Sequence, residues 1–176
     1  MKLRCDATVN GVERRLQIYQ GPSELDEHLP LKLSACLLFW SLDPIVDAST
    51  STPALAQYEF MPDLLCLDDA GDIALWVECG STTMNKLTKL TRRVPAGQGR
   101  IIVLKSNERD AERLRRDIDD QLDRPQRVEV LAWPGDSFKK FVETVADKNE
   151  IFGESTETSL NAVVNDVPFA VDFRRY

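Results

Sequence analysis

A predicted β-hairpin over residues 62–80, PDLLCLDDAGDIALWVECG, constrains the fold of this chain more than any other stretch. Aspartates crowd its centre, and Gly71 supplies backbone angles that other residues resist. With Ala70 and Gly71 as the loop, the facing pairs are Leu67 with Ala74, Leu65 with Trp76, and Asp63 with Glu78. Because facing residues point to the same side of a sheet, the hairpin predicts two carboxylates together at its open end.

Such a carboxylate pair is costly. Like charges that face each other across strands destabilise a sheet by about 0.2–1 kcal/mol, and by more when they are desolvated. The apolar neighbours of Asp63 and Glu78 predict a sheet covered on both faces, which favours desolvation. A divalent cation between the two groups would reverse the effect, since Mg²⁺ takes one or two carboxylates together with waters and substrate phosphate. The alternative is a shifted register that leaves one carboxylate outside in water.

Two short turns predict further hairpins near the ends of the sequence. Asn10-Gly11 separates alternating strands over residues 2–9 and 12–19, and Asn165-Asp166 separates strands over residues 160–164 and 167–173. We expect the two hairpins to pair into a small additional sheet. The polar segment 148–158 before the second hairpin is predicted to be a loop.

Between the hairpins, helices and strands alternate, which predicts an α/β fold with a mixed central sheet flanked by helices. Ser23 is a good N-cap for an apolar helix reaching Leu42, although Pro30 either kinks this helix or precedes a new one at Leu31. Segment 43–57 reads as a surface loop beside the hairpin. The later elements are a helix capped by Ser81 or Thr82 that runs to about Arg93, a parallel strand at 100–105, a helix capped by Asn107, a strand at 128–133 and a helix after Asp136.

The composition is that of a single globular domain over residues 1–176, with 43% hydrophobic and 29% charged residues. The net charge of −7 argues against an indiscriminate nucleic-acid binder but leaves room for a local basic groove. Four scattered cysteines without a C-x-x-C pair predict reduced, buried thiols in a cytoplasmic protein, and His28 has no histidine partner for a zinc site. No signal peptide and no run of about 20 apolar residues is found, so we expect no membrane association.

Several stretches resemble a known family. They are Pro62-Asp63, Gly21-Pro22-Ser23-Glu24 ahead of the apolar helix, Val77-Glu78-Cys79-Gly80 at the end of the hairpin, and the lysine-bearing helix that follows. Together they resemble the YaeQ family, a group assigned to the PD-(D/E)xK nuclease fold. The similarity covers most of the chain and is firmest from residue 21 to about residue 93. Gly80 stands where the wider superfamily has lysine, and YaeQ-like sequences share this glycine.

The resemblance implies a restriction-endonuclease-like core with a metal site. By this interpretation Asp63 and Glu78 hold Mg²⁺ or Mn²⁺, and the Cys79 carbonyl is a third ligand. Glu24 would be an outer acid on the first helix, pointing at the metal. Simple capping of that helix is the alternative role for Glu24, because carboxylates are favoured in a first turn.

The lysine missing at position 80 is expected to come from the next helix. Lys86 and Lys89 lie one turn apart there, so both can face the same way. The resemblance favours Lys89, which matches a lysine of the family. With Arg92 and Arg93, they would form a local basic face that suits the phosphate backbone of DNA or RNA. The alternative is an ordinary solvated basic surface.

Two functions follow as expectations. The first is a metal-dependent nuclease that acts on nucleic-acid phosphodiesters, with Lys89 or Lys86 steadying the charge of the transition state. The second is a nuclease-fold scaffold that binds a protein or a nucleic acid and cuts nothing, which the absent strand lysine and the acidic net charge favour. A purely structural interaction protein, a third possibility, would show no convergence of carboxylates. The substrate and the oligomeric state stay open.

Overall fold

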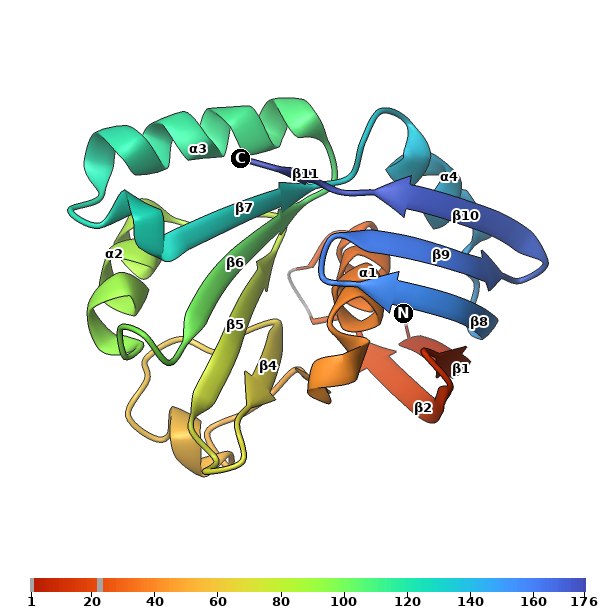
Figure 1. The fold of residues 1–176 in the computed structure, drawn as a ribbon, viewed down its shortest axis with the longest axis horizontal. Helices are drawn as coiled ribbons and strands as arrows, with labels where there is room; N and C mark the ends of the chain where they lie inside the picture. Colours follow the sequence, from red (N-terminus) through yellow and green to blue (C-terminus); the bar gives the residue numbers. More distant parts are fainter. Residues whose placement is uncertain (1, 22–23) are drawn as a thin grey trace.

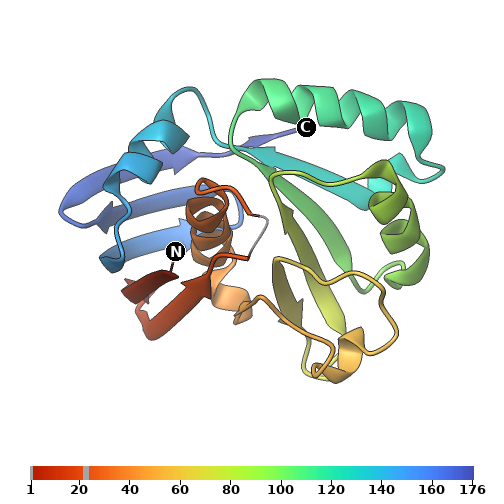
Figure 2. The same ribbon diagram turned by 180° about the vertical axis from the view of Figure 1, so that it is seen from behind.

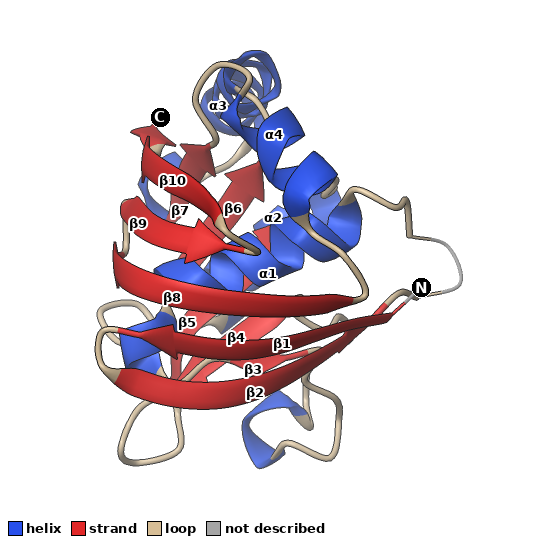
Figure 3. Cartoon of the chain, turned by 90° about the vertical axis from the view of Figure 1, so that its right-hand side faces the viewer, coloured by secondary structure: helices blue, strands red, loops and turns tan. Residues whose placement is uncertain are grey.

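Two mixed β-sheets with helix α1 (His28–Leu38) between them make up the fold (Figures 1 and 3). The structure is a computed structural model and describes residues 2–21 and 24–176. One hydrophobic cluster joins Leu33 of α1 to Leu75 of one sheet and Ile151 of the other. The predicted α/β architecture with two sheets is therefore confirmed, and α1 is the element that both sheets share.

The larger sheet has six strands in the order β11-β7-β6-β5-β4-β3. In chain order these strands are β3 (Ile45–Val46), β4 (Leu64–Leu67), β5 (Ile73–Cys79), β6 (Arg100–Lys105), β7 (Val128–Ala132) and β11 (Arg174–Arg175). The central strands β5, β6 and β7 are parallel, as their helical connections require, and the outer pairings are antiparallel. The carboxyl ends of β5, β6 and β7 therefore meet at one edge of this sheet, where polar side chains can gather.

Helices cover both faces of this sheet (Figures 1 and 2). Helices α2 (Met84–Arg93) and α3 (Glu108–Gln121) share a cluster with Trp76 and Ile101 on one face. Helix α1 packs on the other face, in the cluster that holds Val77. Burial on both faces explains why the central strands are almost continuously apolar.

The second sheet has five strands in the order β10-β9-β8-β1-β2. They are β1 (Lys2–Val9), β2 (Val12–Tyr19), β8 (Lys148–Thr156), β9 (Ser159–Val164) and β10 (Val167–Asp172). Both predicted two-residue turns are confirmed, and the two hairpins do belong to one sheet. The prediction of a loop at 148–158 is wrong, because β8 pairs in parallel with β1 and so joins the hairpins into a sheet larger than expected. Asn149 is a polar residue at a buried position of β8, so the inward-facing residues of this strand are not all apolar. Its side-chain oxygen accepts the Ala146 amide, and its side-chain nitrogen donates to the carbonyls of Ala146 and Arg4.

The helix starts differ in part from the predictions. α1 begins at His28, so Pro30 falls in its first turn, where a missing N–H costs no intrahelical bond. The proposed cap Ser23 lies outside the described residues. Thr83, and not Ser81 or Thr82, caps α2 by accepting the amide of Lys86, whereas Asn107 caps α3 as predicted. The helix after Asp136 is α4 (Ser137–Thr144).

The hairpin of β4 and β5 keeps the predicted register at its middle. Leu65 pairs with Trp76, but a bulge after Cys66 makes Leu67 pair with Ile73 instead of Ala74. The Asp68 carboxylate causes a wider turn than predicted, because it accepts the amides of Ala70 and Asp72. The predicted loop at 43–57 contributes the edge strand β3, and a 3-10 turn at Pro53–Leu55.

The four cysteines are free and buried, as the sequence predicts. Across residues 2–21 and 24–176, no helix combines the length and the apolar character that crossing a membrane would take.

Candidate functional site

Asp63 lies where the chain enters β4, at the carboxyl end of the neighbouring strand β5. Its amide donates to the Val77 carbonyl at 3.1 Å, and its Oδ2 accepts the Cys79 amide at 2.7 Å. The other carboxylate oxygen, Oδ1, lies 3.1 Å from Nε2 of His28 on α1. The Asp63 side chain is therefore fixed between the end of β5 and the first turn of α1.

Three polar residues spaced four apart line the start of α1. Glu24, His28 and Lys32 follow one another at helical spacing, and this spacing is the signal in the sequence that could have identified the group. The Lys32 ammonium lies 2.7 Å from Glu24 Oε1, 2.6 Å from Asp47 Oδ1 and 3.5 Å from Asp63 Oδ1. Its side chain is only 3% exposed, so the lysine is a buried cation held by three carboxylates.

Glu24, His28 and Asp63 form what we call the carboxylate–imidazole group. One ligand atom from each residue lies within 4.8 Å of the other two, a spacing that can hold a metal ion. The sequence pointed to Glu24 and Asp63 as site residues but not to His28, Lys32 and Asp47. Histidine escaped notice because it has no second histidine beside it in the sequence, whereas its partners here are carboxylates from separate elements.

The carboxylates of this group are stabilised as anions. Burial alone would raise the pKa of Asp63, but hydrogen bonds from His28 and the Cys79 amide, with the charge of Lys32, lower it. The pKa of Glu24 is also lowered, since the bonds from Lys32 and the Gly21 amide outweigh burial. A crowded, metal-free pair of Asp63 and Glu78 would have raised the pKa of Asp63. The pKa of Asp63 is lowered instead, mainly by the hydrogen bonds from His28 and the Cys79 amide, with the charges of His28 and Lys32 adding to their effect.

The Glu78 side chain lies on the face of the sheet that α2 covers, opposite the face on which α1 packs. Its side chain is 4% exposed, with Oε1 accepting the Trp76 indole N–H at 2.6 Å and Oε2 accepting the Lys86 ammonium at 2.6 Å. Burial raises the pKa of Glu78, and the nearby Lys86 opposes this only in part. Glu78 therefore keeps its proton to a higher pH than an ordinary glutamate.

Asp63 and Glu78 consequently do not share the close pairing that the hairpin register predicts. Asp63 turns to residues of α1 and Glu78 to a residue of α2, which cover opposite faces of the sheet. The regular pairing begins only at Leu64, because the Asp63 carboxylate takes the Cys79 amide. Cys79 therefore contributes its backbone amide to the site, as a donor to Asp63. Its thiol is buried, and burial raises the pKa of this thiol.

The structure brings Lys86, and not Lys89, to the predicted site. Lys89 lies near the surface with its ammonium 2.6 Å from Glu59, which also pairs with Arg93 at 3.4 Å. Arg92 pairs with Asp123 at 2.9 Å. Each cation of the predicted basic face on α2 is thus matched with a carboxylate, which weakens the attraction of this face for nucleic acid.

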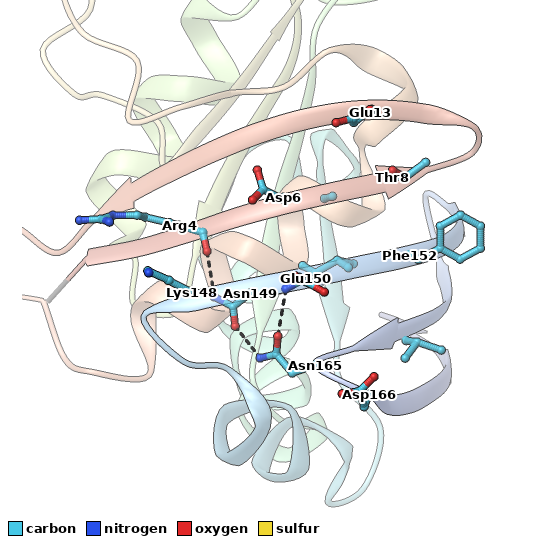
Figure 4. Close-up of a pocket in the computed structure, with 13 residues that line it drawn as sticks. Arg4, Asp6, Thr8, Glu13, Lys148, Asn149, Glu150, Phe152, Asn165 and Asp166 are labelled. Atoms are coloured by element: carbon cyan, nitrogen blue, oxygen red, sulfur yellow. Dashed lines mark hydrogen bonds between the residues drawn. The ribbon is translucent and has the colours of Figure 1, made fainter.

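Two hollows are candidates for the functional site. One of about 370 Å³ lies against the carboxylate–imidazole group and includes Gly80, Ser81 and Lys105 at the carboxyl ends of β5 and β6. A larger one of about 880 Å³ lies on the outer face of the five-stranded sheet (Figure 4). Its walls mix acidic and basic side chains with Phe152, and its Asn165 is engaged by Asn149. We take the smaller hollow as the functional one, because Glu24 and Lys105, whose pKa values are both lowered, line it together with His28.

The lowered pKa of Asp63 predicts a pH-dependent stability. The folded-state pKa of Asp63 lies below its unfolded-state value of about 4. The contribution of the Asp63 carboxylate to the free energy of unfolding is therefore complete above about pH 4, and it is lost as the pH falls from there through the folded-state pKa. Asp63→Asn should therefore destabilise the fold by about 1–3 kcal/mol at pH 7 and by less at pH 3. Urea unfolding across this range measures the difference. Asp69→Asn, in the exposed turn, is the control, and an equal cost of Asp63→Asn at both pH values would contradict the prediction.

Comparisons with known proteins agree on one family. A family model described as "YaeQ protein" matches residues 10–162. The crystal structure of a YaeQ protein from Xanthomonas axonopodis pv. citri is similar, with a TM-score of 0.73 and 16% identity, covering 99% of this chain and 96% of that one. A YaeQ protein from Pseudomonas syringae gives a TM-score of 0.68 and 16% identity, with 99% and 93% covered. A search of curated proteins finds no match. At this identity, the two structures share the fold with this chain.

Proposed function

Because the chain belongs to the YaeQ family, we propose that it is a nuclease-like hydrolase of nucleic-acid phosphodiesters that works with a bound divalent cation. The same proposal assigns the larger sheet and its helices to a restriction-endonuclease-like core of the PD-(D/E)xK superfamily. The observation that carries it is the carboxylate–imidazole group at the edge where β5 and β6 end, with the buried pair of Glu78 and Lys86 on the other face of the same sheet. Perturbed acids gathered at one edge of a sheet are typical of catalytic sites.

The donor set of the carboxylate–imidazole group suits Mn²⁺ better than Mg²⁺. Mg²⁺ strongly prefers oxygen ligands, whereas Mn²⁺ also accepts an imidazole. Glu24, His28 and Asp63 would hold the cation, which would lower the pKa of a bound water and polarise a phosphoryl oxygen. Lys32 already neutralises part of the charge of these carboxylates, so we expect one cation at this position.

The remaining residues have separate roles in this proposal. The Cys79 amide and His28 orient the Asp63 carboxylate. Glu78, whose pKa is raised by burial, can hold or release a proton at Oε2 nearer to neutral pH than an ordinary glutamate. The Lys86 ammonium, fixed on that oxygen at 2.6 Å, provides positive charge for the transition state. Lys86 thus takes the role that the sequence suggested for Lys89.

A cleavage assay tests the proposal. Purified protein is incubated with labelled single-stranded DNA, RNA and plasmid, each with EDTA, Mg²⁺ or Mn²⁺. We expect cleavage in Mn²⁺ that Asp63→Asn abolishes and Asp69→Asn leaves intact. Activity in EDTA, or full activity of Asp63→Asn, would refute the metal-dependent mechanism.

A second candidate is a scaffold that binds a protein or a nucleic acid without cutting it. The observation in its favour is that Asp63 and Glu78 already have protein donors on both carboxylate oxygens. A cation must therefore compete with bonds that the fold has made. Wild-type protein that is folded, inactive under every metal condition and unaltered in melting temperature by Mn²⁺ would favour the scaffold.

A further inference from the structure

Lys105, the last residue of β6, is a half-buried cation without a carboxylate partner among the described residues. Its ammonium donates to the Gly80 carbonyl at 2.5 Å, just past the end of β5. By contrast, Lys32 and Lys86 are both bonded to carboxylates. An ammonium has three donors, so Lys105 keeps hydrogen-bonding capacity, and the charges of Asp110 and Arg113 act on it in opposite directions. Burial lowers the pKa of Lys105, and an anion nearby would restore it.

This ammonium borders the hollow of about 370 Å³ beside the carboxylate–imidazole group. The hydroxyl-bearing residues Ser81 and Ser106 line the same hollow, two residues after β5 and one residue after β6, and Phe138 forms an apolar wall. Glu24 and His28 line it as well, which places Lys105 and the proposed cation site around one space.

The acids that line this hollow are in part neutralised already. Asp110 is bonded by Arg113 at 2.7 Å and by the Asn107 amide group at 3.0 Å, and Glu24 is bonded by Lys32. Glu27 is exposed to solvent. An anion that enters the hollow therefore finds Lys105 as a cation with free donors and two serines as further donors, while Glu24 and Asp110 are engaged by cations and Glu27 is exposed to solvent.

We propose that Lys105, with Ser81 and Ser106, binds a phosphate group of the substrate, and that this substrate is a single nucleic-acid strand or a strand end. The proposal rests on the proposed function and names its substrate. Ligand hollows of about 300–1,000 Å³ take one small molecule, so this one accommodates a single nucleotide unit and not a duplex. Phe138, which is 5% exposed and packs against Trp133, forms only an apolar wall of this hollow.

Binding, measured without cleavage, tests the subsite. A fluorescein-labelled oligothymidylate is titrated in EDTA over a series of salt concentrations. Lys105→Met should weaken binding about tenfold, the scale of one charged hydrogen bond, and should reduce the slope of log affinity against log salt by about 0.7. Lys105→Arg should keep most of the affinity, and Lys89→Met, which removes a surface cation from α2, should change it little. Amide shifts of Ser81 and Ser106 on adding a 5′-mononucleotide to wild type give a second readout.

Unchanged affinity in a folded Lys105→Met protein would overturn the subsite, as would absence of shifts at Ser81 and Ser106. Circular dichroism melting verifies folding, and if Lys105→Met does not fold, the wild-type shifts decide. Tighter, Lys105-dependent binding of a duplex would refute the single-strand assignment. If wild type cleaves nucleic acid but Lys105→Met binds it as tightly as wild type, the subsite proposal is refuted and the nuclease proposal stands. If binding depends on Lys105 but wild type cleaves nothing, the nuclease proposal is refuted and the subsite proposal stands.

Discussion

Lys32→Met should lower the free energy of unfolding by about 3–5 kcal/mol at pH 7 in metal-free buffer. The substitution keeps the apolar stem but removes a 3% exposed ammonium from between Glu24, Asp47 and Asp63. Removing one partner of a buried ion pair leaves uncompensated charge in a medium that solvates it poorly. Hydrogen bonds from Lys32 to Asp47 and Glu24 outweigh burial and raise its pKa, which shows how strongly the three carboxylates favour the cation. Urea unfolding followed by circular dichroism gives the value.

Mn²⁺ should restore part of this loss. With the ammonium gone, a divalent cation is free to bind the three carboxylates, and a ligand that binds only the folded state stabilises it. The Mn²⁺-induced rise in melting temperature should therefore be larger in Lys32→Met than in wild type. Lys89→Met removes an exposed ammonium paired with Glu59 and should cost less than about 1 kcal/mol. A cost for Lys32→Met no greater than for this control would contradict the charge account.

Lys86→Met should reduce the proposed cleavage rate about 10²-fold or more. Its ammonium is fixed on Glu78 Oε2 and beside the Met61 carbonyl at 3.2 Å, so it is a positioned charge and not a mobile surface lysine. Losing one preorganised stabiliser of transition-state charge has an effect of this size. Single-turnover rates at saturating Mn²⁺ measure the chemical step.

The matched control is Lys89→Met, one turn along the same helix, which should stay within a few-fold of wild type. Because Lys86 also opposes the raised pKa of Glu78, Lys86→Met should raise that pKa further and move the pH–rate profile. Equal rate losses in both variants would point to a general effect of charge on α2. An unchanged rate in Lys86→Met would remove this lysine from the mechanism.

Local patterns in the sequence were sufficient for much of the fold. Asn10-Gly11 and Asn165-Asp166 each define a two-residue turn, and Asn107 caps α3, because these effects depend on neighbouring residues only. The strand β8 was predicted as a loop because the segment is polar and contains Gly153, and one of its buried residues, Asn149, is itself polar. Its amide is satisfied by β1 and by the chain before β8, which only the folded structure brings together.

The site was less predictable for the same reason. The sequence indicated the hairpin acids Asp63 and Glu78, but not that Asp63 would leave the regular ladder to take the Cys79 amide. That choice depends on His28 and Lys32, which come from a helix distant in sequence. The choice between Lys86 and Lys89 likewise depends on Glu59, a competitor for Lys89 outside the helix.

The pairing of β1 with β8 has a consequence for synthesis of the chain. Arg4 pairs with Lys148, so the first strand waits for most of the chain before its neighbour exists. Until β8, β9 and β10 leave the ribosome, only the hairpin of β1 and β2 can cover the side of α1 that faces the five-stranded sheet. Long-range pairing of this kind slows folding and exposes hydrophobic surface to other chains. We therefore expect part of the apolar surface of α1 to stay exposed in the nascent chain until β8, β9 and β10 pair over it.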